Sequence, residues 1–464
     1  MLETISARRR LFVEQIDRLV AFSLEYIRRH RQDVHALDRQ RDNLLQMVTA
    51  CGQYLGDWHR AARIALGLDE YMMRRGHWRS WAAYLEDIAH ALAEERAYGL
   101  EGEVWRALGN AYCGSGQWEP AYRAHRRAIG AFRRAGDARS IAYSLFDLGR
   151  VRWFQGEWQE ALRCYRQAET LARSLPDDSL FLARIANVIG LTYWRQGRWR
   201  WAVRHFRRAL RLCPDDPQYA RNRGRMMSNL ALALTDLGRW EEAERSYRAA
   251  LQFSEQAGDT TGLAYTWGDL SDLYRRQRRW EEAEACLERA EALWERAEDA
   301  AGQADHAEHR GRLCADRGEV AQARHWLDQA LKSWGALGNE HKIAELQILL
   351  AEVAVRQGSY CEADQWMKQA RFLAHRLGRR DLLVRLHALQ AAIEGGQGRW
   401  LQAVWTRLKG LACGLPALRN DRTWRAVREL GLPQRHGRLG VSSLCVSRLP
   451  VMSKRLADRI KQLR

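Results

Sequence analysis

A single pattern of apolar and small residues recurs along most of this chain every 40 or 41 residues. Each unit contains a turn residue, usually glycine, then a large apolar residue two positions later, and alanines three and ten positions beyond that. A bulkier side chain lies seven positions after the large apolar residue. Steps of three, four and three put these positions on one face of a helix. The pattern therefore predicts an amphipathic helix that begins at each large apolar residue and lets a neighbour approach closely.

The large apolar position is occupied in successive units by Trp78, Trp118, Trp158, Trp199, Trp240, Trp280, Val320, Tyr360 and Trp400. The alanine pairs are Ala121 and Ala128, Ala161 and Ala168, Ala202 and Ala209, Ala243 and Ala250, Ala283 and Ala290, Ala323 and Ala330, and Ala363 and Ala370. The bulkier residues between them include Tyr165, Phe206, Tyr247, Leu287, Leu327 and Met367. We expect the tryptophans of this series to contribute much of the stability, because Trp199→Ala or Trp240→Ala costs roughly 3–5 kcal/mol if the indole is buried.

A second helix precedes each of these helices. It ends near a Leu-Gly step or its equivalent, at 108–109, 148–149, 189–190, 230–231 and 270–271, and Gly, Pro, Asp and Asn cluster between units. Each unit therefore reads as two antiparallel helices of about 16–18 residues with a breaker at both ends. One such pair cannot bury its apolar faces alone, so the units must stack.

Two segments connect the pattern to a known family. Residues 105–112, WRALGNAY, and residues 267–274, WGDLSDLY, resemble the signature of the tetratricopeptide repeat, although its usual unit has about 34 residues. Arg278 replaces the turn glycine, Arg152 the usual tyrosine and Val320 the aromatic residue. The resemblance covers about residues 37–413 and implies an all-α, right-handed solenoid of about nine to ten helix pairs.

The start of the array has a narrower resemblance. Residues 30–81 contain a degenerate unit around Gly56, Trp58 and Ala61, and are similar to the helical sensor arms of bacterial STAND-type signalling NTPases and transcriptional regulators. No Gly-Lys dipeptide occurs and the first lysine is Lys332, so no Walker-type phosphate loop is predicted. The chain thus resembles the arm without its NTPase domain.

The same patterns divide the chain into four segments. We predict an N-terminal helical cap at residues 1–36, degenerate first helices at 37–97, the repeat array at 98–413 and a basic tail at 414–464. The tail ends in VMSKRLADRIKQLR, whose apolar and basic residues fall on separate faces at the helical period. This spacing predicts a short basic amphipathic helix. Such a helix either caps the last apolar face of the array or contacts nucleic acid or a partner.

Charge and composition indicate where the positive charge lies along the chain and which cellular compartment to expect. The formal net charge is +18, and residues 179–226 hold 11 arginines and two aspartates, whereas residues 227–300 hold nine arginines and 16 acidic residues. Residues 419–464 hold 12 Lys or Arg and three acidic residues, so the positive charge is concentrated in two places. No apolar run is long enough to insert into a membrane, and the nine cysteines are widely spaced, which is typical of a reducing cytoplasm.

The sequence predicts no enzyme, no cofactor and no metal. No HExxH, GxSxG, helix-opening GxGxxG or calcium loop occurs. Asp305, His306 and His309 form the nearest approach to a ligand cluster, and we interpret them as a solvated helix face. Catalysis needs groups that converge in a pocket, whereas a regular solenoid provides a groove.

Binding in that groove is the predicted function. In arrays of this family the first helices line the concave face, which implies a set of groove residues. They are Arg106, Asn110, Tyr143, Arg150, Trp153, Arg184, Asn187, Trp194 and Arg225, with Phe146 and Ser228 beside them. Arginine binds carboxylates bidentately and asparagine can hold an extended backbone, so we expect a protein or peptide partner, and the arginines favour an acidic one. Packing between repeats is the alternative role of Trp153 and Trp194.

A stripe of arginines on one predicted second helix is the alternative binding feature. Arg200, Arg204, Arg207, Arg208 and Arg211 cluster on the face opposite its apolar residues. They are either a solvated face or a surface for phosphate groups or an acidic protein. The main prediction is a bacterial signalling scaffold or sensor arm, and a nucleic-acid-associated regulator that uses the stripe and the tail is the alternative.

Overall fold

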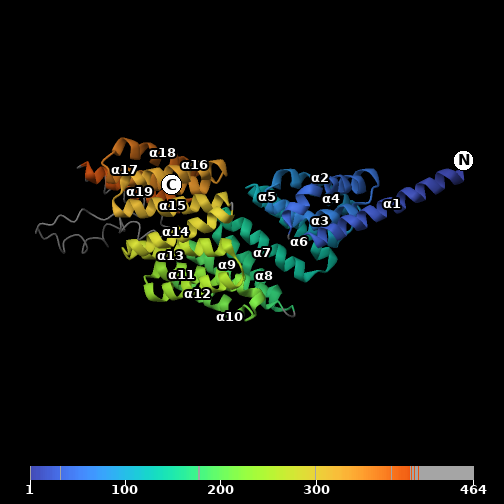
Figure 1. Cartoon of the computed structure of the whole chain (residues 1–464), viewed down its shortest axis with the longest axis horizontal. Helices are drawn as coiled ribbons and strands as arrows, with labels where there is room; N and C mark the ends of the chain where they lie inside the picture. Colours follow the sequence, from blue (N-terminus) through green and yellow to red (C-terminus); the bar gives the residue numbers. More distant parts are fainter. Residues whose placement is uncertain are drawn as a thin grey trace, which may run out of the picture.

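The computed structural model describes residues 2–31, 33–175, 178–297, 299–377 and 379–397, together with residues 399, 402 and 406. Every regular element among these residues is helical, which confirms the predicted all-α class (Figure 1). The first helices of the pairs are α1 (Leu2–Arg29), α3 (Trp58–Arg74), α5 (Tyr98–Gly114), α7 (Ala138–Phe154), α9 (Ser179–Arg195), α11 (Ala220–Leu237), α13 (Thr260–Arg276), α15 (Ala300–Arg317), α17 (Glu340–Arg356) and α19 (Arg380–Gly396).

The second helices are α2 (Val34–Thr49), α4 (Trp78–Glu94), α6 (Trp118–Ala135), α8 (Trp158–Arg173), α10 (Trp199–Leu212), α12 (Trp240–Gln256), α14 (Trp280–Ala297), α16 (Val320–Ala336) and α18 (Tyr360–Arg376). From α4 to α18, each begins at the large apolar residue that the sequence pattern indicated. A π-helix (Ala50–Tyr54) follows α2, and a 3₁₀ turn (Pro217–Tyr219) precedes α11. The predicted unit of two antiparallel helices is therefore confirmed, while the basic tail at 414–464 and Trp400 lie outside the described residues.

The pairs stack into one curved array. Each helix packs against the next one in the chain, and first helices of successive pairs also pack against each other, as α11, α13 and α15 do. The second helices consequently lie on the outer side. The array follows the colour gradient of Figure 1 from the projecting α1 to the helices that bend back above α9–α13.

Glycine and alanine let the two helices of each pair approach closely. All fourteen alanines of the predicted pairs are buried, with exposed fractions of at most 1%. Phe206 is fully buried against Gly190, where a Cβ atom would lie 2.6 Å from the phenyl ring, and Tyr165 lies in the same way against Gly149. The bulky residue of one helix therefore occupies the space that the missing side chain of its partner leaves.

The burial on which the expectation about the tryptophans depends is met at Trp199 but only in part at Trp240. Trp199 is 6% exposed and belongs to the core, whereas Trp240 is only partly buried. Aromatic residues seven positions later, such as Phe206 and Tyr247, are fully buried. In the repeat of α12 the larger stability effect is therefore expected at Tyr247, because Trp240 keeps one side open to solvent.

The turn within each pair keeps its geometry when glycine is absent. Gly238 adopts a left-handed φ of 76°, and Arg278 takes the same conformation with φ of 60°. The Gly238 amide donates to the Thr235 carbonyl at 3.1 Å, and the Arg278 amide donates equivalently to Arg275 at 3.0 Å. The arginine is tolerated at a conformational cost of roughly 1 kcal/mol, and the fold of this unit is unchanged.

Candidate functional site

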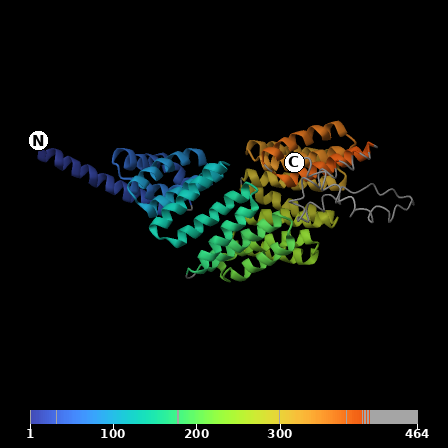
Figure 2. The same cartoon turned by 180° about the vertical axis from the view of Figure 1, so that it is seen from behind.

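The first helices from α9 to α17 lie on the concave side of the curved array (Figure 1). The array curves so far that the guanidinium group of Arg195 on α9 lies 3.9 Å from the carboxylate of Glu345 on α17, although 150 residues separate them. Figure 2 shows the same turn from behind, with the orange helices above the green ones. His341 and Arg379 also lie 3.6 Å from Glu345. Burial by itself raises the pKa of Glu345, but the surrounding cations lower it below its usual range.

Two predicted groove arginines share one carboxylate of the chain. Arg106 on α5 and Arg150 on α7 lie 3.7 Å and 3.5 Å from the two oxygens of Asp147, whose side chain is nearly buried between them. Tyr143 stacks on Phe181 with ring centroids 4.0 Å apart. These residues lie on first helices as expected, but both guanidinium groups contact the Asp147 carboxylate, which compensates one of their two positive charges.

Two other predicted arginines have no such partner. Arg184 on α9 and Arg225 on α11 occupy equivalent positions of adjacent repeats and are exposed. No carboxylate of the described part of the chain pairs with either guanidinium group. Arg184 lies over the Phe146 ring at 5.3 Å, which holds its aliphatic stem against α7. The groove therefore presents two uncompensated positive charges one repeat apart.

An amide pair lies one helical turn from these arginines. The Asn229 Nδ2 group on α11 donates a hydrogen bond to Asn187 Oδ1 on α9 at 3.0 Å. Asn187 is buried and Asn229 is half-buried, so the Asn229 carbonyl oxygen, which this bond does not use, belongs to the more exposed member of the pair. Asn187 was predicted and Asn229 was missed, although Asn229 occupies the position that Asp147 has two repeats earlier.

The two predicted tryptophans contact the same cation. The guanidinium group of Arg195 lies 5.3 Å from the ring centroid of Trp153 and 5.4 Å from that of Trp194. Trp194 Nε1 donates to Asp236 Oδ2 on α11 at 2.7 Å. The contacts of Trp194 thus join neighbouring repeats, which is the packing role that the sequence left as an alternative.

Two further predicted groove residues are less exposed. Asn110 lies half-buried on α5, and Ser228 donates a long hydrogen bond of 3.5 Å to Asp269.

The groove wall beyond α13 is an ion-pair network. Lys342 Nζ on α17 lies 2.7 Å from Asp305 and 2.9 Å from Glu308, both on α15. His309 lies 3.6 Å from Asp305, and only 18% of its side chain is exposed. The interpretation of Asp305 and His309 as a solvated face is therefore wrong, because α17 supplies a lysine that partly covers them. Sequence spacing within one helix could not reveal a partner 37 residues away.

Asp269 on α13 is the poorly compensated acid of this region. Burial raises the pKa of its carboxyl group to about 7, and the nearby Asp305 and Asp272 carboxylates add to the rise, whereas His309 opposes it. Asp272 shows the reverse, since Arg275 and Arg276 hold its pKa below the usual range in spite of burial. Asp269 is thus the acid whose proton is lost near neutral pH.

We expect Asp269→Asn to remove a pH-dependent loss of stability. Between pH 4 and pH 7 the folded carboxyl group keeps a proton that the unfolded chain has released, so stability falls as pH rises. From pH 5.5 to pH 8 the wild type should lose about 1–2 kcal/mol relative to the variant. Urea unfolding of both proteins at the two pH values measures this difference. A difference that does not change with pH would contradict the assignment.

The five arginines of the predicted stripe do not form one continuous exposed surface in the structure. Arg200, Arg204, Arg207 and Arg211 line a groove on the outer face, whereas Arg208 forms an ion pair with Glu169 on α8. Arg207 also pairs with a carboxylate of the chain, that of Glu242 on α12. The sequence predicted one continuous basic face, but the neighbouring helices take part of it.

Within the described residues, no three His, Cys, Asp or Glu side chains are arranged to hold a metal ion. None of the helices that the structure describes is both long and apolar enough to cross a membrane. The concave groove and the outer arginine groove are therefore the two surfaces of interest.

The stacked helix pairs place this protein in the class of helical-repeat solenoids. Tetratricopeptide repeat models match residues 100–174, 144–215, 222–296 and 269–337, which together span half of the chain. The chain belongs to the tetratricopeptide repeat family. No curated protein sequence matches it significantly.

Several solved structures share this fold at low sequence identity. A Rap protein in complex with the competence and sporulation factor has a TM-score of 0.54 and 14% identity, and the match covers 78% of this chain and 99% of that one. The Rap conjugation regulator of plasmid pLS20, in complex with the Phr* peptide, has a TM-score of 0.53 and 16% identity over 76% of this chain and 98% of that one. The apo quorum sensor NprR from B. thuringiensis gives 0.52 and 13% over 77% and 99%. At these identities the likeness concerns the fold alone.

Proposed function

We propose that this protein binds a peptide, free or as an extended segment of a partner protein, on the concave face across α9 and α11. One observation carries the proposal: the unpaired Arg184 and Arg225 lie beside the Asn187–Asn229 amide pair. Arginines bind carboxylates as a fork, and free amide groups match the donors and acceptors of a peptide backbone. The site suits a peptide with an acidic side chain or a free C-terminal carboxylate.

The surroundings of the site support binding by a preformed groove. Arg106, Arg150 and Lys342 are held in ion pairs on both sides of it, so its walls do not need to order when a ligand arrives. Two solenoids of similar fold are complexes with a peptide or a signalling factor, and the function we propose is of that regulatory kind. A signalling or regulatory role in the bacterial cytoplasm, by binding and not by catalysis, is part of this proposal. A further neighbour is named an aspartyl phosphate phosphatase, so turnover of phosphorylated substrates deserves a direct assay.

The test compares two matched double variants. Hexapeptides with free C-termini are selected from a random library on the full chain, and the best binder is measured by fluorescence anisotropy. Arg184→Ala/Arg225→Ala should weaken it about tenfold or more, since two carboxylate contacts are lost. Arg245→Ala/Arg296→Ala removes the same charge from exposed outer positions and should change affinity less than about twofold. Equal binding by wild type and the first variant would place the peptide elsewhere and reject the proposed site.

A further inference from the structure

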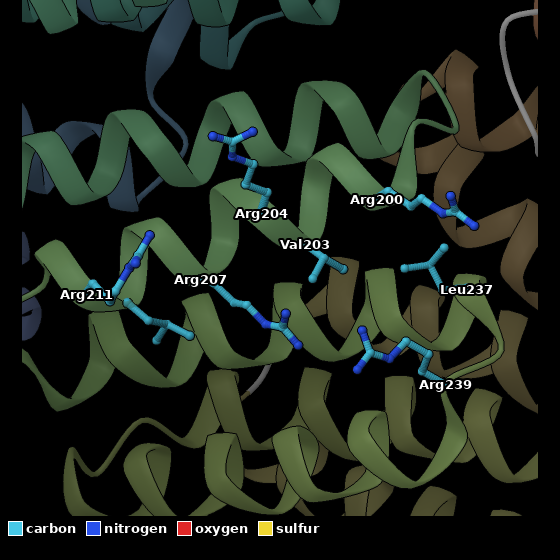
Figure 3. Close-up of a pocket in the computed structure, with 8 residues that line it drawn as sticks. Arg200, Val203, Arg204, Arg207, Arg211, Leu237 and Arg239 are labelled. Carbon is cyan, nitrogen blue, oxygen red and sulfur yellow. The ribbon is translucent and has the colours of Figure 1, made fainter.

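A groove on the outer face lies between α10 and the turn that joins α11 to α12. It has a volume of about 840 Å³ and is lined by Arg200, Val203, Arg204, Arg207, Leu210, Arg211, Leu237 and Arg239 (Figure 3). Leu237 and Arg239 come from the next repeat, so the groove exists only because the repeats stack. The second helices lie outside the concave face, and this groove is therefore independent of the peptide site proposed above.

Helix α10 has an unusual charge composition. Its 14 residues contain five arginines and no acidic residue. Arg200 lies in the first turn, where the helix dipole favours anions, and the first turns of α12 and α14 each carry two glutamates. Arginines three and four residues apart also repel one another along the helix. These unfavourable terms fall when an anionic partner covers the helix.

Part of this positive charge lacks a partner. Among the residues that the structure describes, no carboxylate pairs with Arg200, Arg204 or Arg211. Arg207 and Arg239 point toward each other in Figure 3, and both pair with the carboxylate of Glu242. Two of the arginines that line the groove thus hold one carboxylate of the chain between them, and an acidic partner would supply further carboxylates to the remaining three.

The floor of the groove is apolar. Val203 is 5% exposed, and Leu210 and Leu237 are partly exposed beside it. Val203 and Leu210 lie seven residues apart, which is about two helical turns. An amphipathic helix presents aliphatic side chains at this spacing, whereas a sugar–phosphate backbone has none to cover the floor. The combination of arginine rims and an aliphatic floor favours a protein segment over a nucleic acid.

We propose that the outer groove docks an acidic amphipathic helix of a partner protein. Acidic side chains of that helix pair with Arg200, Arg204 and Arg211, and its aliphatic side chains cover Val203, Leu210 and Leu237. A scaffold with this second surface holds two ligands at once, one on each face.

The probe for this groove is a fluorescein-labelled synthetic helix of about 14 residues, four turns, with glutamates on one face and leucines at i, i+3 and i+7. The full chain should bind it, and Arg204→Glu/Arg211→Glu should weaken binding about tenfold or more because the charges then repel. Arg245→Glu reverses the equivalent charge of Arg204 in the next repeat and should change affinity less than about twofold. A second peptide with serine in place of leucine should bind several-fold more weakly, since it leaves the floor uncovered.

Three outcomes overturn the proposal. They are failure of the full chain to bind the leucine-containing helix, equal binding by Arg204→Glu/Arg211→Glu, and equal binding of the serine peptide. A labelled oligonucleotide that binds instead, and is lost in the same variant, would assign the groove to nucleic acid. Circular dichroism of the variant shows that it is folded. Arg184→Ala/Arg225→Ala should leave helix binding unchanged, so failure of this proposal and failure of the concave peptide site are distinguishable.

Discussion

Replacement of Phe206 by alanine is expected to lower the free energy of unfolding by about 3–5 kcal/mol. The ring is fully buried and lies against Gly190, which has no side chain to move into the space left behind. The backbones of α9 and α10 would have to shift to close this cavity, so we expect a value in the upper part of that range. Chemical denaturation followed by circular dichroism measures the change.

Two further variants test the packing explanation. Trp201→Ala removes a larger ring from the same helix, but Trp201 is 44% exposed, so the expected cost is below about 1 kcal/mol. Gly190→Ala should be destabilising alone and nearly neutral in the Phe206→Ala background, because the added methyl group then meets no ring. Additive effects of the two substitutions would show that glycine and phenylalanine do not pack as a unit.

The second large effect is expected at Lys342, for which methionine should cost about 2–4 kcal/mol. Methionine keeps the volume of the side chain but leaves the carboxylates of Asp305 and Glu308 without the ammonium group between them. Asp305 and Lys342 are mostly covered by the groove, with 21% and 26% of their side chains exposed, so water replaces the lost charge poorly.

A surface lysine provides the matched control. Lys368 lies 2.8 Å from Asp364 one turn away, but 71% of the lysine side chain is exposed. Lys368→Met should therefore change stability by less than about 0.5 kcal/mol. If both methionine variants had the same small effect in urea denaturation, the groove network would be no stronger than an ordinary surface pair.

The two proposed surfaces are formed by different helices of the repeats. First helices supply Arg184 and Arg225 to the concave site, and second helix α10 supplies the outer arginines. Neighbouring repeats contribute to both, as Asn229 and Arg239 do. Each surface can therefore be altered by substitution while the other keeps its residues, which is what the variants above exploit.

The sequence predicted the repeat well, because the repeat depends on local rules. The 40-residue period located the start of every second helix from Trp78 to Tyr360, and every alanine of the predicted pairs is buried. Helical periodicity and turn residues act over a few positions, so they can be read from one sequence. The same rules did not show which aromatic residue is fully buried. Trp240 and Tyr247 lie two turns apart on one apolar face of α12, but only Tyr247 is completely covered.

The candidate site was only partly predictable. The sequence by itself determined which residues lie on first helices, so Arg106, Arg150, Arg184, Asn187 and Arg225 were correctly assigned to them. It did not determine which of these charges remain available, because some partners come from another helix, as Asp147 on α7 does for Arg106 on α5. Packing of neighbouring repeats brings Arg106 to Asp147 and Asn229 to Asn187, and curvature of the whole array brings Arg195 to Glu345. Local spacing fixes the face on which a side chain lies, whereas its charge balance depends on distances across the stacked repeats, which only the tertiary structure sets.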